Sequence, residues 1–321
     1  QTAVEYAVKA GFALGCNINK FSVFDRKNYF YPDLPKAYQI SQLQRPLCIN
    51  GVVPIEVNGK KKNIRINRIH LEEDAGKLVH DDFNNVSLAD YNRCGIPLIE
   101  IVTEPDIASS EEAKAFVEKI SLLLQYAGVC DCKMEQGSLR CDVNVSIMKP
   151  EDKEFGTRTE CKNLNSIKAV GRAIDYEIKR QARVLDMGGR VIQETRRWDE
   201  NKGKTFAMRS KENAQDYRYF PEPDIPPVSI SEEEIQHYIE ICPEFADAKA
   251  KRYISDFKLS EEDAGIIAGS KYFAQLFEKT VELCNDPSEV RYWIITQILY
   301  FMNERNVQPE DIKLSPEKFA Q

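Results

Sequence analysis

The sequence Ser138-Leu139-Arg140-Cys141-Asp142-Val143-Asn144-Val145-Ser146-Ile147 alternates without a break between polar and apolar side chains. Successive side chains of a β-strand point to opposite faces, so the stretch predicts a strand with one apolar and one polar face. The polar face carries Ser, Arg, Asp and Asn, whereas solvated sheet faces are usually rich in Lys, Glu and Thr. We therefore favour a ligand-facing sheet, with a solvated face as the alternative.

Further strands and helices are expected on both sides of this strand. Asn58-Gly59 is a strong hairpin signal inside a strand-rich region over residues 45–104. Ser109-Ser110-Glu111-Glu112 is a capping box that predicts the start of a helix, and Gly128 predicts its end. The remaining predictions are helices over residues 3–15 and 164–187, and strands over residues 158–163 and 191–209.

Four prolines between residues 221 and 227 separate two kinds of pattern. Strands and helices are both expected before them. After them the pattern is helical, with caps at Ser231 and Ser260 and apolar helical spacing over residues 272–283 and 288–302. The sequence therefore predicts an α+β domain over residues 1–228 and an all-α helical domain over residues 229–321.

The composition limits the possible partners. The 321 residues include 44 Lys and Arg and 51 Asp and Glu, which gives a net charge of −7. Proteins that grip nucleic acid through its backbone are usually basic, so an RNA contact here needs a local patch. Residues 60–65 and 179–183 are candidates, although both also suit a solvated face. No apolar run is long enough for a membrane span, and we expect a fragment of a longer protein.

The nine cysteines are scattered, odd in number and mostly placed in apolar runs. This pattern predicts reduced thiols in a cytoplasmic protein rather than a disulfide framework. Cys130 and Cys132 form the one close pair in the sequence. A zinc site normally needs a second pair or a neighbouring His, so we do not expect a metal there.

Carboxylates in strands are the best candidates for chemistry, because the chain has no phosphate-binding glycine loop, dinucleotide fingerprint or nucleophile elbow. Glu100 lies in the apolar run of residues 96–102. A buried carboxylate needs a cation, so Glu100 binds either a metal ion or an arginine, with Arg68, Arg93 and Arg140 available. Hard oxygen ligands and few histidines favour Mg²⁺. The basic residues suited to phosphate are Lys27, Arg140 and Lys162.

Residues 24–42, Phe-Asp-Arg-Lys-Asn-Tyr-Phe-Tyr-Pro-Asp-Leu-Pro-Lys-Ala-Tyr-Gln-Ile-Ser-Gln, form an aromatic-basic run without helical or strand period. The run suits a surface that grips an anionic, flat or polar ligand, with an ordered surface loop as the alternative. It resembles the signature segment of the GatB family, the B subunits of the tRNA-dependent aspartyl/glutamyl amidotransferases, and four further blocks match that family in order. They are Arg68-Ile-His70-Leu-Glu72-Glu73-Asp74-Ala-Gly76-Lys77, the block of residues 90–106 with Pro97-Leu-Ile-Glu100, Met134-Glu135-Gln136-Gly137-Ser138-Leu139-Arg140-Cys141-Asp142-Val-Asn144-Val-Ser146, and the block from Glu194-Thr195-Arg196-Arg197-Trp198 to Asp216-Tyr217-Arg218-Tyr219-Phe220-Pro221-Glu222-Pro223-Asp224.

The resemblance implies a fold and an activity. The expected fold is a cradle domain around an antiparallel β-sheet with flanking helices, followed by a helical domain that begins the tRNA-binding C-terminal region. The expected reaction is ATP- and Mg²⁺-dependent phosphorylation of the side-chain carboxylate of Glu-tRNA(Gln) or Asp-tRNA(Asn). Ammonia that a partner amidase subunit releases from glutamine then gives the amide. A small adaptor subunit completes the GatCAB complex, a cytoplasmic heterotrimeric ligase of protein biosynthesis.

The resemblance also implies site residues. Glu73 and Glu100 resemble the metal-binding carboxylates of the family. The blocks that resemble the lining of the kinase pocket supply Lys27, Ser138, Arg140 and Asp142 as catalytic residues, and the ATP phosphates are assigned to Lys27, Arg140 and Lys162. Family members carry an N-terminal strand and a C-terminal tail that have no counterpart here, and Gln136 stands where many have a second Glu. We therefore expect no activity from this chain alone.

Two other readings stay open at this stage. A non-catalytic scaffold that docks tRNA would have Glu73 and Glu100 pointing apart, or each tied to an arginine. A metal-dependent phosphoesterase would share the two-carboxylate pocket, but would hydrolyse ATP or nucleic acid without any aminoacyl-tRNA.

Overall fold

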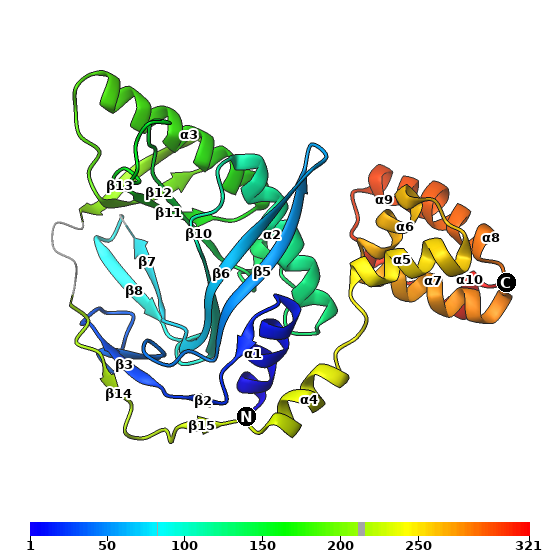
Figure 1. Cartoon of the computed structure of the whole chain (residues 1–321). Coiled ribbons are helices and arrows are strands. Elements are labelled where there is room, and N and C mark those ends of the chain that lie inside the picture. Colours follow the sequence, from blue (N-terminus) through cyan, green and yellow to red (C-terminus); the bar gives the residue numbers. More distant parts are fainter. Residues whose placement is uncertain (82, 211–215) are drawn as a thin grey trace. The chain divides into compact units, whose positions relative to one another are not determined.

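The computed structural model describes residues 1–81, 83–210 and 216–321 (Figure 1). Contacts within the chain define two compact units. Unit 1 comprises Gln1–Ile120 and Cys130–Ile239, and unit 2 comprises Ser121–Val129 and Glu240–Gln321. The domain boundary expected near residue 229 stays a prediction. No helix in the described residues combines the length and the apolar composition needed to cross a membrane.

An antiparallel sheet of four strands, in the order β1-β5-β6-β9, organises the first half of unit 1 (Figure 1). The predicted hairpin is confirmed, because Asn58 and Gly59 are the two loop residues between β5 and β6 and both have positive φ, 51° and 73°. The strands are β1 (Asn17–Ile18), β5 (Cys48–Val57), β6 (Lys60–Glu73) and β9 (Pro97–Thr103).

Helix α1 (Thr2–Ala13) packs against this sheet. The apolar positions that alternate along β5 and β6 are buried, among them Ile64 and Ile66, together with Ala7 of the helix. Gly51 of β5 lies against the segment that follows helix α1, where no side chain fits. A Cβ at that position would lie 2.4 Å from the Cys16 sulfur, closer than any real contact.

A second sheet, in the order β10-β11-β12-β13, contains the strand predicted at residues 138–147. The regular strand covers only Cys141–Val145, because residues 138–140 belong to the preceding loop. β10 and β11 pair antiparallel, whereas β11 and β12 are parallel and are joined through helix α3. The fold is thus α+β with mostly antiparallel sheets. The other elements are β11 (Thr159–Leu164), α3 (Ile167–Asp186), β12 (Glu194–Asp199) and β13 (Lys204–Ser210).

The aromatic-basic run of residues 24–42 contains two strands, β3 (Asp25–Asn28) and β4 (Tyr38–Ser41). The alternative interpretation of this run as a surface loop is therefore wrong at both ends, where strands form. Its polar side chains fix the pairing in place of an apolar face: buried Asp25 accepts a hydrogen bond from the Leu43 amide, and Arg26 binds Glu222. β3 also pairs with β14 (Phe220–Pro221), so the sheet order is β14-β3-β4.

The remaining elements are helix α2 (Ser110–Tyr126), which begins in unit 1, and several short strands, turns and helices of unit 1. The predicted helix after the capping box is confirmed as α2, and the Glu112 amide donates to the Ser109 hydroxyl. The C-terminal end of α2 counts with unit 2. The others are β2 (Phe21–Ser22) with β15 (Val228–Ser229), the pair β7 (Lys77–Asp81) and β8 (Val86–Asp90), a 3₁₀ turn (Met134–Gln136) and α4 (Glu232–Glu240).

Helices make up the regular structure of unit 2 in its described residues. Its core includes Tyr253, Ile267, Phe277 and Ile294, which are fully buried, and the Tyr126 hydroxyl from α2 donates to the Ala268 carbonyl. The helices are α5 (Ala246–Phe257), α6 (Glu261–Ala268), α7 (Lys271–Cys284), α8 (Pro287–Tyr292), a π-helical segment (Trp293–Ile298), α9 (Leu299–Arg305), a 3₁₀ turn (Pro309–Asp311) and α10 (Pro316–Phe319).

A buried carboxylate joins α3 to the second sheet. Glu177 is fully buried, accepts a hydrogen bond from Thr159 of β11 at 2.9 Å, and lies 3.1 Å from the Arg196 guanidinium of β12. Thr205 of β13 also donates to it, and Arg180 of the same helix lies 2.8 Å away. Burial alone would raise the pKa of Glu177, but the hydrogen bonds from Arg180 and Thr205 outweigh burial and lower it.

We predict that Glu177→Gln lowers the free energy of unfolding of unit 1 by about 3 kcal/mol at pH 7, because two arginines lose a buried partner. A depressed carboxyl pKa stabilises the fold above the unfolded value of about 4.3, and the stabilisation is lost as pH falls through the folded value. The gap between wild type and variant should therefore close below about pH 4.

Urea unfolding followed by Trp198 fluorescence, in a Trp293→Phe background, measures this gap in unit 1. Asp175→Asn, an exposed change on the same helix, is the matched control and should stay within about 0.5 kcal/mol of wild type. A Glu177→Gln variant as stable as this control would show that the buried carboxylate does not hold α3 to the sheet.

Candidate functional site

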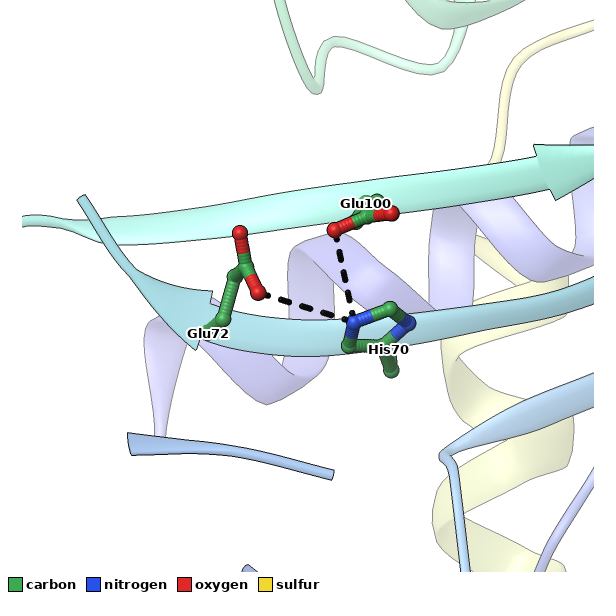
Figure 2. Close-up of side chains that lie close together, drawn as sticks. All are labelled: His70, Glu72 and Glu100. Atoms are coloured by element: carbon green, nitrogen blue, oxygen red, sulfur yellow. Dashed lines mark ion pairs between the residues drawn. The ribbon is translucent and has the colours of Figure 1, made fainter. Parts of the chain in front are cut away.

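Three side chains converge where β6 and β9 pair (Figure 2). His70 and Glu72 lie two residues apart on β6 and so share a face, and Glu100 of β9 is the ladder partner of His70. The His70 Nε2 atom lies 3.6 Å from a Glu100 oxygen and 3.7 Å from a Glu72 oxygen. One ligand atom from each residue lies within 4.8 Å of the others, which makes this a candidate cation site.

The electrostatics of the cluster favour a bound cation. Burial, and then the neighbouring Glu72 charge, raise the pKa of Glu100. Burial would also raise the pKa of Glu72, but His70 and Lys27 outweigh it and lower that pKa. The Glu72 charge disfavours the ionised form of Glu100, and a cation placed between the two carboxylates would relieve this repulsion. The Glu100 side chain is 44% exposed, so the cluster is reachable from solvent.

The donor set fits a divalent ion. An ion with bonds of about 2.1 Å holds its ligand atoms about 3 to 4 Å apart, close to the separations seen here. The two carboxylate oxygens suit Mg²⁺ or Mn²⁺, and the imidazole is better suited to Mn²⁺ or a heavier transition metal. The buried Nδ1 of His70 has no hydrogen-bond partner in the described part of the chain. A protonated His70 would bridge the same two carboxylates without metal.

Glu73, the other predicted metal ligand, lies elsewhere. It follows Glu72 along β6 and therefore faces the opposite side of the sheet. Its carboxylate oxygens accept hydrogen bonds from Lys36 at 2.7 and 2.8 Å and from the Ile40 amide at 3.2 Å. Glu73 and Glu100 thus do not converge, which is what the scaffold reading required. Glu72 and His70 take the place beside Glu100 instead.

Lys27 is brought to the cluster from β3. Its positive charge contributes to the lowered pKa of Glu72 and opposes the burial that raises the pKa of Glu100. Its ammonium group lies over the ring of Tyr217 at 5.0 Å and over that of Tyr29 at 5.8 Å. A hollow of about 370 Å³ opens nearby in the chain, lined by Asn28, Tyr29, Phe30, Ala37, Asp216 and Arg218.

Arg140 is held by a buried carboxylate. Asp74, which is 6% exposed, lies 2.7 Å from the Arg140 guanidinium and 3.2 Å from that of Arg93. Arg93 also donates to the Gly137 carbonyl at 3.1 Å. Two of the three arginines proposed as partners of Glu100, Arg93 and Arg140, therefore bind Asp74. The described residues contain no ion pair between Glu100 and these two arginines or Arg68.

The other predicted residues pair among themselves. Lys162 of β11 lies 2.6 Å from Asp142 of β10 and 3.5 Å from Glu160. The Ser138 hydroxyl binds the Asp131 carboxylate and accepts a hydrogen bond from the Lys133 amide. None of the contacts in the described residues joins Asp142, Lys162 or Ser138 to the His70 cluster.

Sequence reasoning missed His70 and Glu72 as possible ligands. The signal was present in the alternation of residues 70 and 72, since side chains two apart share a strand face. The ladder register that sets Glu100 opposite His70 includes an irregularity between Ile66 and Arg68, which no local pattern in the sequence reveals.

Comparisons with known proteins agree with the resemblance noted in the sequence. A family model described as the GatB/GatE catalytic domain matches residues 1–236. The chain is 58% identical over 317 residues to the B subunit of the aspartyl/glutamyl-tRNA(Asn/Gln) amidotransferase of Lachnoclostridium phytofermentans, covering 99% of this chain and 66% of that protein. The B subunits of Caldicellulosiruptor saccharolyticus (55% over 321 residues, 99% and 67% covered) and Brevibacillus brevis (52% over 314 residues, 98% and 66%) are similar. The chain spans about two thirds of the length of these relatives.

We predict that the chain binds one divalent ion at this cluster, and that Glu100→Gln and Glu72→Gln each weaken Mn²⁺ binding at least about tenfold. Glu73→Gln removes the same charge from the opposite face of β6 and should change the affinity by less than about twofold. Calorimetric titration of the metal-free chain with Mn²⁺ and Mg²⁺ measures the affinity and the number of bound ions for wild type and for each variant. Equal losses for Glu72→Gln and Glu73→Gln would contradict the assignment.

Proposed function

Because the chain belongs to the GatB/GatE catalytic domain family, we propose that it carries the catalytic part of the B subunit of an aspartyl/glutamyl-tRNA amidotransferase. The observation that carries the proposal is the convergence of His70, Glu72 and Glu100, whose two carboxylates both interact with the charge of Lys27. Carboxylates for a divalent ion next to a lysine for phosphate are the components that phosphoryl transfer needs. The proposed enzyme is an ATP-dependent carbon–nitrogen ligase with glutamine as the amide donor.

The proposed reaction has two steps. A side-chain carboxylate oxygen of Glu-tRNA(Gln) or Asp-tRNA(Asn) attacks the γ-phosphorus of ATP, and the bond to ADP breaks. Ammonia then attacks the carbonyl carbon of the acyl phosphate, phosphate leaves with the bonding electrons, and the nitrogen loses a proton. The amidase subunit supplies the ammonia from glutamine, and the adaptor subunit joins the two in the cytoplasm.

The residues of this chain bind and orient the reactants in this proposal. His70, Glu72 and Glu100 would hold the ion, with Mg²⁺ as the proposed species, and when bound it neutralises phosphate charge. Lys27, on a strand and flanked by two tyrosine rings, offers its ammonium to the transferred phosphate. Arg140, oriented by Asp74, contributes a guanidinium for a second phosphate oxygen.

Asp142, Lys162 and Ser138 remain proposed site residues, although no contact in the described residues joins them to the His70 cluster. Asp142 and Lys162 neutralise each other on the polar face of the second sheet, so Lys162 reaches ATP phosphate only by leaving Asp142. Ser138 stiffens the loop that leads to Arg140 through its contacts with Asp131 and Lys133. We also propose that unit 1 corresponds to the cradle domain and that unit 2 begins the tRNA-binding region.

We predict that Glu100→Gln lowers the rate of amidation about 100-fold or more, because losing a metal ligand removes several kcal/mol of charge stabilisation. The assay follows Glu-tRNA(Gln) to Gln-tRNA(Gln) with ATP, Mg²⁺ and ammonium chloride, using the complete protein with its amidase and adaptor partners. Glu56→Gln, exposed on β5 of the same sheet, is the matched control.

Retained tRNA binding by Glu100→Gln, with amidation lost, supports a phosphorylation site on this chain. Equal amidation by Glu100→Gln and Glu56→Gln would leave this chain as the tRNA-docking scaffold and would move the chemistry to a partner.

We predict that Asp74→Asn raises the KM for ATP about tenfold with a smaller change in kcat, because Arg140 loses the charge that orients it. Asp106→Asn removes a similar carboxylate–arginine pair, with Arg65 at 2.6 Å, from another part of the same unit and serves as the control. Circular dichroism confirms that both variants fold. An unchanged KM for Asp74→Asn would show that Asp74 has only a structural role.

A further inference from the structure

A pair of thiols lies outside the site described above. Cys130-Asp131-Cys132 forms part of the loop between α2 and the 3₁₀ turn at Met134–Gln136. Cys130 is partly exposed, Cys132 is 9% exposed, and neither belongs to a disulfide. The cluster of possible metal ligands found in the described residues does not include them.

The backbone folds the second cysteine back onto the first. Cys132 has a φ of +57°, a left-handed conformation that non-glycine residues seldom adopt. Its amide donates to the Cys130 sulfur at 3.2 Å, and its thiol points back to the Cys130 carbonyl at 3.8 Å. The Cys130 thiol donates to the Ser138 carbonyl at 3.2 Å. The turn therefore brings the amide and the thiol of Cys132 back onto Cys130, whose own sulfur is partly reachable from solvent.

The surroundings favour the thiolate of Cys130. Hydrogen bonds from the thiol and amide of Cys132 lower the pKa of Cys130 to about 6, against the opposing effects of burial and of the Asp131 charge. Other cysteines of the chain behave in the opposite way. Burial raises the pKa of Cys16 to about 11, and that of Cys141 to about 12.

We propose that Cys130 and Cys132 form a peroxide-sensitive dithiol, with Cys130 as the attacking sulfur and Cys132 as the resolving one. The Cys130 sulfur attacks one oxygen of hydrogen peroxide, the O–O bond breaks, and hydroxide leaves, giving a sulfenic acid. The Cys132 sulfur then attacks the Cys130 sulfur, the S–O bond breaks, and hydroxide leaves again. The two thiols lose two electrons and the peroxide becomes two molecules of water.

The disulfide would change the loop that follows it. Bonding to Cys132 takes the Cys130 sulfur away from the Ser138 carbonyl and from the Cys132 amide. The neighbouring Lys133 amide, bound to the Ser138 hydroxyl at 2.9 Å, belongs to the same network. An effect of oxidation on ATP use, through Ser138 and Arg140, rests on the function proposed above. The thiol chemistry does not rest on it, so the two can fail separately.

The experiment treats the reduced chain with a limiting amount of hydrogen peroxide, blocks the remaining thiols with N-ethylmaleimide and maps the peptides by mass. We expect the first product to be two hydrogens lighter, with the bond between Cys130 and Cys132. Cys132→Ser should stop at a sulfenic acid on Cys130 that dimedone traps, and Cys130→Ser should remove the fast reaction. Cys284→Ser, which removes the exposed thiol of the chain, is the matched control and should leave it unchanged.

Two further measurements separate a tuned thiol from a merely accessible one. Iodoacetamide at pH 6 should label Cys130 about tenfold faster than a cysteine in an unstructured peptide, since a larger thiolate fraction outweighs a weaker nucleophile. Hydrogen exchange at the Lys133 amide should accelerate after oxidation. Oxidation at Cys284 before Cys130, or peptide-like labelling of Cys130, would overturn the proposal.

Discussion

The alternation of side chains at the end of β6 is the constraint on which the rest of unit 1 depends. His70 and Glu72 point to one face and meet Glu100, whereas Glu73 points to the other and binds Lys36. Asp74 ends the series by pairing with Arg93 and Arg140 from two separate loops. Through Glu73 and Asp74, this end of β6 attaches the central sheet to three neighbouring parts of the chain. A slip of one residue in the β6–β9 register would exchange the two faces and dissolve every one of these pairs.

Buried charge explains why these attachments are specific. A carboxylate removed from water costs several kcal/mol unless a cation or several donors meet it, so each acidic group here fixes the position of a basic one. Glu222 fixes the position of Arg26, with a nitrogen–oxygen distance of 2.6 Å, and thereby attaches the segment after residue 216 to β3. Glu177 does the same for Arg180 and Arg196 in the second sheet. Apolar burial sets the layers, and these ion pairs set which loops face the candidate site.

Local patterns predicted the elements of the fold well, because capping, turn chemistry and alternation act over a few residues. The Asn58-Gly59 hairpin, the helix after Ser109 and the strand around Asp142 all follow from such signals. The parallel pairing of β11 with β12 and the pairing of β3 with β14 do not, since both join segments that are distant in sequence. The site shows the same difference. The apolar neighbours of Glu100 identify it from the local sequence, whereas the convergence of Glu72 and His70 with it depends on the register between β6 and β9.

Several cations around the His70 cluster are paired with carboxylates. This pairing determines how an acidic chain can bind a phosphate ligand. Lys36 and Arg140 each contact a carboxylate, so neither creates a broad positive field that would attract polyanions from a distance. Lys27 lies over the rings of Tyr29 and Tyr217, and its charge acts on both Glu72 and Glu100. Recognition must then come from fixed geometry at short range, where preorganised groups act on charge that develops during the reaction. A net charge of −7 is compatible with such a site, because a few oriented cations are enough once the carboxylates hold them in place.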